Sequence, residues 1–234
     1  MSRAALDFRV NWLGRMEFNR ALVLQEGIVL KKHEDRSVED QLLLLEHGPV
    51  YTIGRTPDRS SLSAAGRIRG SEPGNAPLPH PLFVINRGGQ ATYHGPGQLI
   101  GYPIIDLRRF GQDLHKYLRW LEQLLIDLLE EKGIAAARRE SFTGVWVGDR
   151  KIASIGVGIR HWITMHGFAL NVCGDLSPFD NIVPCGINNI EMTSMEKESG
   201  NAVSVGAVAA SIQRLAPARI KDLRVIREAQ PIQV

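Results

Sequence analysis

Cysteine is scarce in this sequence: Cys173 and Cys185 are the two cysteines among 234 residues. Two cysteines do not make a disulfide framework in a chain of this length, so we expect both thiols to stay reduced. The histidines are dispersed, and neither H-x-x-x-H nor C-x-x-C occurs. The phosphate-binding patterns G-x-x-x-x-G-K-[ST] and G-x-G-x-x-G are also missing. The sequence therefore predicts no metal site and no cofactor.

Long apolar runs are missing as well. No stretch approaches the ~18 apolar residues of a membrane-spanning helix, so no membrane insertion is expected. The first 18 residues contain Asp7 and Glu17 and no apolar core, which argues against a secretory or transit peptide. We expect a cytoplasmic protein, with an organelle matrix as the second choice. The length suits one domain covering residues 1–234.

Lysine is rare relative to arginine, because only seven of the 28 basic residues are lysines. The net charge is +3, and the planar guanidinium of arginine suits carboxylate and phosphate groups. An acidic protein or a phosphorylated ligand is therefore the expected kind of partner. The basic residues are scattered and form no stripe interleaved with aromatic residues, so no nucleic-acid partner is expected.

Apolar spacing predicts mixed strands and helices. Residues 40–55 contain two apolar strands separated by a Gly-Pro break, which we expect to pair or lie adjacent. Asp113 and Ser204 are expected N-caps, and residues 63–81 are rich in proline and glycine and predict a surface loop insertion. Other strands are predicted at 8–13, 82–87, 98–107, 144–160 (turning at Gly148 and Asp149) and 162–172, and helices at 15–35, 114–132 and 205–215. Prominent hairpins favour an α+β fold around a mainly antiparallel sheet flanked by helices.

A glycine-rich segment, "RGGQATYHGPGQLIG", lies between two predicted strands and contains five glycines. Glycine permits close approach of the backbone to another group, because it has no Cβ. The segment also carries Arg87, Gln90, Thr92, Tyr93 and His94, and thus donors and a titratable ring. We interpret it as a binding loop; a glycine-rich hairpin without a ligand is the alternative.

Cys185 stands between Pro184 and Gly186, a pair that favours a turn. A turn can expose a thiolate and aim backbone N–H groups at a reacting carbonyl, although unpaired cysteine is also commonly a buried apolar residue. Lys151 opens the apolar strand "KIASIGVGI" and is either a charge that protects a sheet edge or an ammonium that stabilises this thiolate. His94 and His166 are rival candidate bases, and Cys173 is interpreted as structural.

Four blocks occur in one order: "RGGQATYHGPGQL", "GVWVGDRKIASIGV", "HGFALNV" and "IVPCGI". In these blocks, over roughly Trp12 to Thr193, the chain resembles the lipoyl/octanoyl transferases, which attach lipoate precursors. The resemblance implies the α+β catalytic fold of biotin and lipoate protein ligases. It also implies that Cys185 carries the acyl group as a thioester and that Lys151 favours its thiolate.

The resemblance further implies a substrate-lining set in three segments. Two positions depart from the family pattern, since Ser154 stands where alanine is common and Gly158 where arginine is common, and the insertion at 63–81 is longer than expected. The implied substrate-binding residues are Arg87, Gly88, Gly89, Gln90, Ala91, Thr92, Tyr93, His94, Ser154, Ile155, Gly156, Gly167, Phe168 and Ala169.

The activity implied is transfer of an octanoyl group from octanoyl-acyl-carrier protein through Cys185 to the lysine of a lipoyl domain. The implied acceptors are the lipoyl domains of 2-oxoacid dehydrogenases and the glycine cleavage H protein. Exchange of one thioester for another is nearly isoenergetic, so no ATP is required. The alternatives are an ATP-dependent lipoate or biotin ligase, a non-catalytic module that binds the carrier protein, and a cysteine hydrolase.

Overall fold

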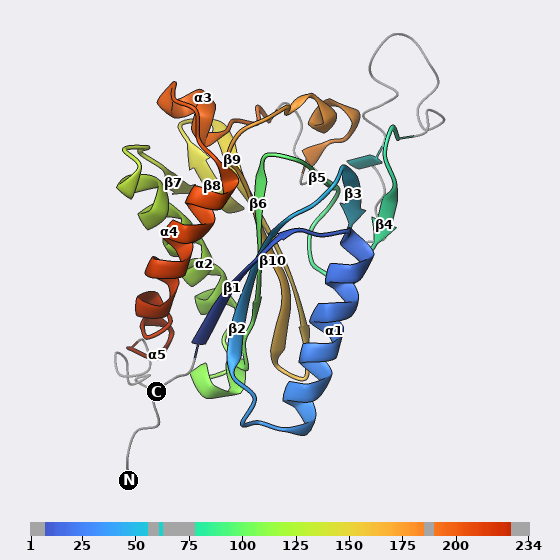
Figure 1. Ribbon diagram of the computed structural model, residues 1–234, viewed down its shortest axis with the longest axis vertical. Coiled ribbons are helices and arrows are strands. Elements are labelled where there is room, and N and C mark those ends of the chain that lie inside the picture. The colour runs from blue at the N-terminus through green and yellow to red at the C-terminus, as the bar shows by residue number, and fades with distance from the viewer. Residues whose placement is uncertain (1–7, 56–60, 63–77, 185–189, 226–234) are drawn as a thin grey trace.

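Two sheets organise the fold in the computed structural model, which describes residues 8–55, 61–62, 78–184 and 190–225. Within these residues, seven strands form a large sheet in the order β1-β2-β6-β10-β9-β8-β7, and three form a small sheet in the order β4-β3-β5 (Figure 1). The strands are β1 (Phe8–Arg15), β2 (Asp40–Glu46), β3 (Val50–Ile53), β4 (Leu82–Val84), β5 (Thr92–His94), β6 (Gln98–Ile104), β7 (Ala137–Arg139), β8 (Phe142–Val147), β9 (Arg150–Arg160) and β10 (Ile163–Asn171). The helices are α1 (Phe18–Glu34), α2 (Leu114–Glu131), α3 (Met195–Ser199), α4 (Val205–Arg219) and α5 (Asp222–Val225), with 3-10 turns η2 (Leu107–Phe110) and η3 (Ser177–Asn181).

The large sheet is mixed but mainly antiparallel. Its strands β1 and β2 pair in parallel, whereas β2, β6, β10, β9, β8 and β7 pair antiparallel in turn. The predicted fold class is confirmed. The predicted pairing of the two strands within 40–55 is wrong, because β2 has both edges occupied by β1 and β6. The Gly48–Pro49 break instead carries the chain into the small sheet, where β3 pairs with β4 and β5.

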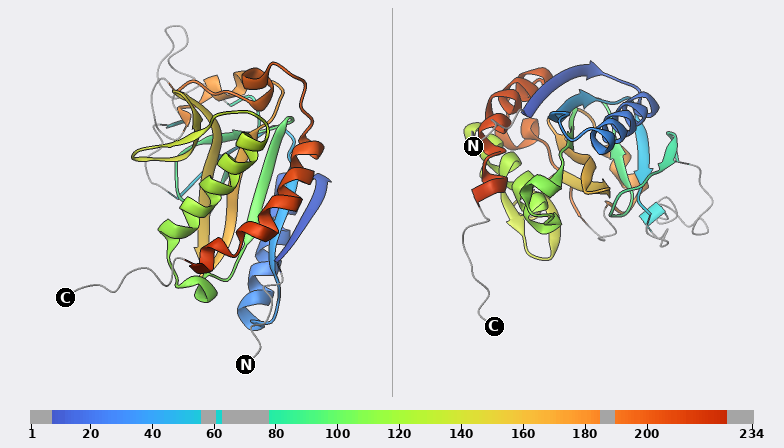
Figure 2. Two further views of the ribbon diagram at one scale, coloured as in Figure 1. Left: turned by 90° about the vertical axis from the view of Figure 1, so that its left-hand side faces the viewer. Right: turned by 90° about the horizontal axis from the view of Figure 1, so that it is seen from below.

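Helices cover both faces of the large sheet (Figures 1 and 2). Strand β2 is buried on both sides as a result. Its four consecutive leucines point alternately to the two faces of the sheet. Leu42 and Leu44 join the core cluster that includes α2 and α4, while Leu43 and Leu45 pack in the cluster that includes α1. An uninterrupted apolar run is the expected pattern for a strand buried on both sides.

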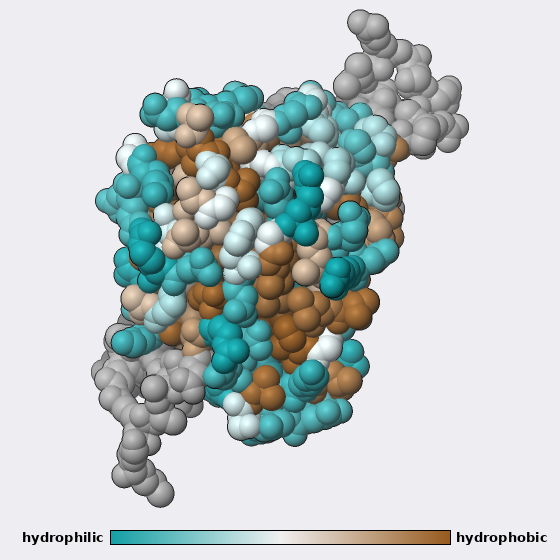
Figure 3. Space-filling model, viewed as in Figure 1, coloured by the Kyte–Doolittle hydropathy of each residue, from teal (hydrophilic) through white to brown (hydrophobic). Residues whose placement is uncertain are grey.

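Helix α2 follows its sequence pattern closely. The Asp113 carboxylate accepts from the Lys116 N–H at 3.0 Å, and the Ser204 hydroxyl accepts from the Ala207 N–H at 3.2 Å in front of α4. Both predicted N-caps are therefore confirmed. Helix α1 is less one-sided and exposes Val23 and Leu30. Figure 3 shows apolar surface over this helix. No helix in the described part of the chain is long and apolar enough to cross a membrane.

Two short strands were not predicted. Strand β5 lies inside the glycine-rich segment and pairs with β3, placing Thr92 opposite Thr52. Strand β7 adds an edge to β8. Both strands are only three residues long and are defined by their partners, so local spacing carries little signal for them. The predicted insertion at 63–81 lies outside the described residues except for its last four.

Candidate active site

A pocket lies where the glycine-rich segment meets β9 and β10. Its cavity volume is about 50 Å³. All the residues of the predicted substrate set line it except Gly88, Ala91 and Tyr93. Three segments distant in the sequence are therefore brought together around one cavity. The lining residues are Phe18, Ile85, Arg87, Gly89, Gln90, Thr92, His94, Tyr102, Ser154, Ile155, Gly156, His166, Gly167, Phe168 and Ala169.

The alternation of β5 explains which residues of its segment reach the pocket. Thr92 and His94 face the cavity, whereas Ala91 and Tyr93 pack on the other side in a core cluster with Tyr51. The Gly88 N–H donates to the Val157 carbonyl at 2.9 Å. Gly88 therefore ties the segment to β9, while the side chains of Ala91 and Tyr93 support it from behind.

Arg87 organises the loop from within. Its guanidinium is buried and donates to the carbonyls of Gly88 and Gln90 at 2.9 and 3.0 Å. It also donates to the Thr52 carbonyl at 3.0 Å and the Thr52 hydroxyl at 2.8 Å. These charge-assisted bonds join the glycine-rich segment to β3, so Arg87 shapes this wall of the pocket.

The pocket histidines are uncharged at neutral pH. Burial, followed by the charges of His47 and Arg87, holds the pKa of His94 well below its usual value. Burial and the nearby Arg87 lower the pKa of His166 to about 4. A strongly lowered pKa makes His94 a weak base, because a general base works best with a pKa near the working pH. His94 is therefore disfavoured as the proton acceptor that the sequence left open.

His47 and Tyr102 form a buried hydrogen-bonded pair beside the pocket, which Tyr102 lines. The Nδ1–H of His47 donates to the Met16 carbonyl at 2.7 Å, so its Nε2 accepts from the Tyr102 hydroxyl at 2.8 Å. Within the described part of the chain, the Thr92 hydroxyl, the Ser154 hydroxyl and His166 Nε2 are buried side-chain groups with no hydrogen-bond partner. All three residues line the pocket, which can therefore bind a polar group of a substrate as well as hydrocarbon.

Replacing His166 by glutamine is expected to flatten the acid side of the stability profile. The folded protein keeps His166 neutral down to about pH 4, whereas the unfolded chain binds a proton near pH 6.5. The contribution of His166 to the free energy of unfolding therefore falls as the pH drops below about 6.5, by about 1.4 kcal/mol per pH unit until about pH 4. Urea unfolding at pH 7 and pH 5 measures the difference. His115→Gln on the exposed face of α2 is the control, and equal slopes for His166→Gln and wild type would contradict the assignment.

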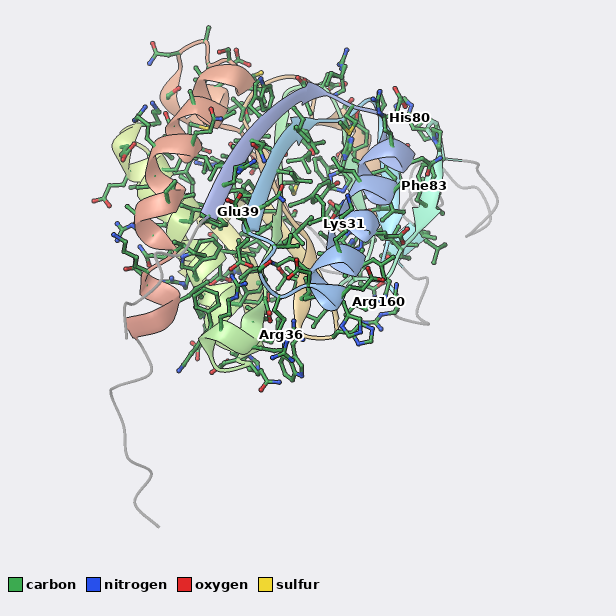
Figure 4. All side chains as sticks on the ribbon, turned by 60° about the horizontal axis from the view of Figure 1, so that its bottom comes forward. Lys31, Arg36, Glu39, His80, Phe83 and Arg160 are labelled. Atoms are coloured by element: carbon green, nitrogen blue, oxygen red, sulfur yellow. The ribbon has the colours of Figure 1, made fainter. Side chains whose placement is uncertain are left out.

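Several residues that line the pocket were not predicted from the sequence as substrate-binding residues. Phe18 opens α1 and packs on Phe83 of β4 with ring centroids 4.9 Å apart; Phe83 is labelled beside α1 in Figure 4. Ile85 follows β4 and Tyr102 lies in β6, and neither belongs to a local motif. His166 was considered only as a base, although a histidine within an apolar strand was a usable signal, and its backbone adopts a left-handed φ of 56°.

A β-bulge determines where Lys151 points. Val145 pairs with Ala153 and Trp146 with Lys151, so Ile152 is an extra residue on β9. Directly paired residues share a face, and Val145, Ile152 and Ala153 all belong to the helix-covered core. Lys151 therefore lies on the opposite face, the one on which Ser154 lines the pocket.

The Lys151 side chain is 1% exposed. Its ammonium donates to the Thr143 carbonyl at 3.2 Å and lies 5.2 Å from the centroid of the Trp146 ring. The backbone of Lys151 pairs with the segment after residue 190, accepting from the Thr193 N–H at 3.0 Å and donating to the Glu191 carbonyl at 2.8 Å. The ammonium is thus held in place at the pocket face of the sheet.

Cys185 lies outside the described residues, so the structure does not describe the distance between its sulfur and the Lys151 ammonium. The chain on either side of residues 185–189 is anchored to the predicted segments. The Val183 N–H donates to the Ser61 carbonyl at 2.8 Å, and the Ser61 hydroxyl donates to Gln90 Oε1 at 3.0 Å. On the other side, Glu191 and Thr193 hydrogen-bond to Lys151. Val183 is therefore linked through Ser61 to the glycine-rich segment, and Glu191 and Thr193 lie beside Lys151.

Cys173 has a different environment. Burial, followed by the charges of Glu196 and Glu46, raises the pKa of its thiol. It is therefore a poor nucleophile at neutral pH.

Among the described residues, no group of three histidine, cysteine, aspartate or glutamate side chains is arranged to hold a metal ion.

Gly158 shows why one family position departs from its usual residue. A Cβ at Gly158 would lie 2.3 Å from the Asn86 carbonyl oxygen. The backbone beside the glycine-rich segment occupies this space, so the arginine that is common at this position does not fit here without a backbone shift.

Comparisons with known proteins show the family of this chain. The family model described as the lipoyl protein ligase A/B catalytic domain matches residues 18–215. The chain belongs to this family. The octanoyltransferase of Geobacter sulfurreducens is 48% identical over 200 residues, which cover 86% of this chain and 79% of that protein. The octanoyltransferase of Geobacter metallireducens is 47% identical over 220 residues, covering 94% and 97% of the two chains.

Solved structures of lipoate and biotin protein ligases share the fold. A bipartite lipoate protein ligase from Thermoplasma acidophilum aligns with a TM-score of 0.59 at 16% identity, covering 92% of this chain and 84% of that one. A biotin protein ligase from Aquifex aeolicus, in complex with biotin and ATP, aligns with a TM-score of 0.55 at 13% identity, covering 92% and 72%. The predicted family, fold and acyltransferase class are confirmed.

Proposed function

We propose that this protein is an octanoyltransferase of lipoate biosynthesis that works through a thioester on Cys185. The observation that carries the proposal is the position of Lys151: its ammonium lies on the pocket face of β9, and its backbone anchors the chain that follows Cys185. Octanoyl is proposed as the acyl group because relatives at 47–48% identity are octanoyltransferases.

The first half-reaction transfers the acyl group to the enzyme. The Cys185 thiolate, stabilised by the Lys151 ammonium, attacks the thioester carbonyl of octanoyl-acyl-carrier protein. The carbon–sulfur bond to the carrier breaks, and the leaving thiolate takes a proton from Lys151. The pocket-lining residues from the glycine-rich segment, β9 and β10 hold the acyl group during this exchange. The products are the octanoyl thioester of Cys185 and the free carrier thiol.

The second half-reaction forms an amide. The acceptor lysine enters as a free amine after losing one proton to solvent, and it attacks the Cys185 thioester. Lys151, now neutral, accepts the second proton of that amine, and Cys185 leaves as the thiolate. The initial ion pair is restored without ATP, because the amide is more stable than the thioester.

We propose acidic protein partners for both steps, in the cytoplasm. The donor is octanoyl-acyl-carrier protein, and the acceptors are lipoyl domains of 2-oxoacid dehydrogenases and the glycine cleavage H protein. The excess of arginine over lysine suits such partners, since opposite charge speeds the encounter of two proteins.

An acyl adduct tests the proposal. Incubation with octanoyl-acyl-carrier protein, without ATP, is expected to add one octanoyl mass to the protein, and Cys185→Ala is expected to abolish both the adduct and transfer to a lipoyl domain. Intact-mass spectrometry measures the adduct. Cys173→Ala is the matched control and should keep the adduct.

The other outcomes separate the alternatives. A requirement for ATP and free octanoate indicates a ligase, which is the activity named for the proteins of similar fold. Release of free octanoate without transfer indicates a hydrolase. Binding of the carrier without an adduct indicates a non-catalytic module. An adduct that persists in Cys185→Ala rejects the proposed nucleophile.

A further inference from the structure

A buried carboxylate lies behind Lys151. Glu122 is on α2, is 1% exposed, and points into the sheet. Its Oε1 accepts from the Gly144 N–H at 3.1 Å. Its Oε2 accepts from Arg119 Nη1 at 2.7 Å and from Arg138 Nε at 3.0 Å. One oxygen of the carboxylate therefore binds two arginines, and the other binds the backbone of β8.

One peptide unit connects Glu122 to Lys151. The Thr143 carbonyl and the Gly144 N–H belong to the same peptide group. The N–H donates to the Glu122 carboxylate, and the carbonyl accepts from the Lys151 ammonium at 3.2 Å. A negative group, a peptide and a positive group thus form one hydrogen-bonded chain. Such chains strengthen each member, because each bond polarises the next by an estimated 10–30%.

Gly144 makes this chain possible. It adopts a φ of +132°, which side chains rarely tolerate, and a Cβ there would lie 2.8 Å from Cε of Lys151. The lysine side chain therefore passes directly over the peptide. This glycine is in the block "GVWVGDRKIASIGV", where sequence analysis assigned a role only to Lys151 and the residues after it.

We propose that Glu122 is a positioning residue for the transfer reaction. Its carboxylate fixes the Thr143–Gly144 peptide, and that peptide holds the Lys151 ammonium at the pocket face. The inference rests on the proposed function, in which this ammonium stabilises the Cys185 thiolate.

Glu122→Gln is a sharp test because the amide cannot replace the carboxylate. If its oxygen faces Arg119 and Arg138, its NH₂ meets the Gly144 N–H, and two donors oppose each other. If the oxygen faces Gly144, the NH₂ meets two arginines. The substitution preserves shape and removes the charge, and in the first orientation it also releases the peptide.

The readout is the pH dependence of alkylation of Cys185 by iodoacetamide, measured in a Cys173→Ala background. Loss of the anchored ammonium is expected to move the profile to higher pH and to slow alkylation at pH 7 by about three- to tenfold. Removal of a negative charge through space alone would move the profile to lower pH. An unchanged profile or a shift to lower pH would overturn the proposal.

A double-mutant cycle separates positioning from general damage to the fold. In a Lys151→Met background, Glu122→Gln is expected to cause no further change in alkylation, because the anchored group is already missing. An equal shift in both backgrounds indicates a structural role and overturns the proposal. Asp106→Asn removes another buried carboxylate, paired with Arg108, and is expected to leave the profile unchanged.

Two further arms complete the design. If Glu122→Gln does not fold, Glu122→Asp replaces it: the charge remains but is drawn back from Gly144, so a smaller shift in the same direction is expected, and no shift overturns the proposal. Transfer by Lys151→Met at the wild-type rate would reject the proposed function itself. Loss of transfer in Lys151→Met, with wild-type alkylation in the Glu122 variants, would reject only the role of Glu122.

Discussion

Lys151→Met is expected to slow octanoyl transfer to a lipoyl domain by about 10²- to 10⁴-fold, the usual contribution of a positioned acid–base group. Methionine fills a similar space but has no charge and no proton to exchange with Cys185 or with the acceptor amine. The backbone bonds from residue 151 to Glu191 and Thr193 do not involve the side chain, so the chain after Cys185 stays anchored. Single-turnover transfer at saturating donor measures the loss.

Lys197→Met is the matched control for this experiment. Lys197 is an exposed lysine on the short helix α3, and its replacement should leave the transfer rate unchanged. Circular dichroism and the melting temperature establish that both variants are folded. A folded Lys151→Met protein that keeps more than roughly a tenth of the wild-type rate would contradict the assigned acid–base role.

Lys32→Met is expected to lower the free energy of unfolding by up to about 3–5 kcal/mol, because it removes the nearest charged partner of the buried Asp40 carboxylate, which keeps a longer contact of 3.4 Å with Arg109. Lys32 and Asp40 are 1% and 0% exposed, and their charged atoms are 2.8 Å apart. The Lys32 ammonium also donates to the Val38 carbonyl at 2.6 Å. Urea unfolding measures the change, and the transfer rate of the folded fraction should be unaffected, since this pair lies outside the pocket.

Lys31→Met provides the comparison on the same helix. Lys31 is exposed one position earlier and is labelled in Figure 4. Its replacement is expected to change stability by less than about 0.5 kcal/mol, as is usual for surface positions. The double variant Lys32→Met/Asp40→Asn should regain part of the lost stability, because it removes a buried charge that the more distant Arg109 compensates less well than Lys32. Equal stability of the Lys31 and Lys32 variants would contradict the buried pair.

Sequence reasoning succeeded where the determining contacts are local. The period of the leucines in α2 and the cap residues Asp113 and Ser204 follow from interactions within a few residues, so the three long helices were placed well, whereas the short helices α3 and α5 were not predicted. The small sheet depends on β3 meeting β5 across about forty residues, and no local pattern encodes that pairing. The same reason explains the wrong pairing of β2 with β3.

The candidate site divides in the same way. Its three segments were identified through their resemblance to a family, and the structure gathers most of their residues around one cavity. Phe18 and Tyr102 reach that cavity from elements with no motif, so only the fold could reveal them. Glu122 looked like one more charge on a helix, because its role depends on which peptide of β8 packs against it.

The extra residue Ile152 interrupts the alternation of side chains along β9, in which successive residues otherwise point to opposite faces of the sheet. With the bulge, Ile152 and Ala153 both face the helix-covered core and Lys151 faces the pocket side. If the same residues paired with β8 without the bulge, alternation from Ala153 would turn Lys151 into the apolar layer beneath α2 and α4. The irregular pairing at this one position is therefore as necessary to the site as the lysine itself, because the same sequence in regular register would carry the ammonium on the other face of the sheet.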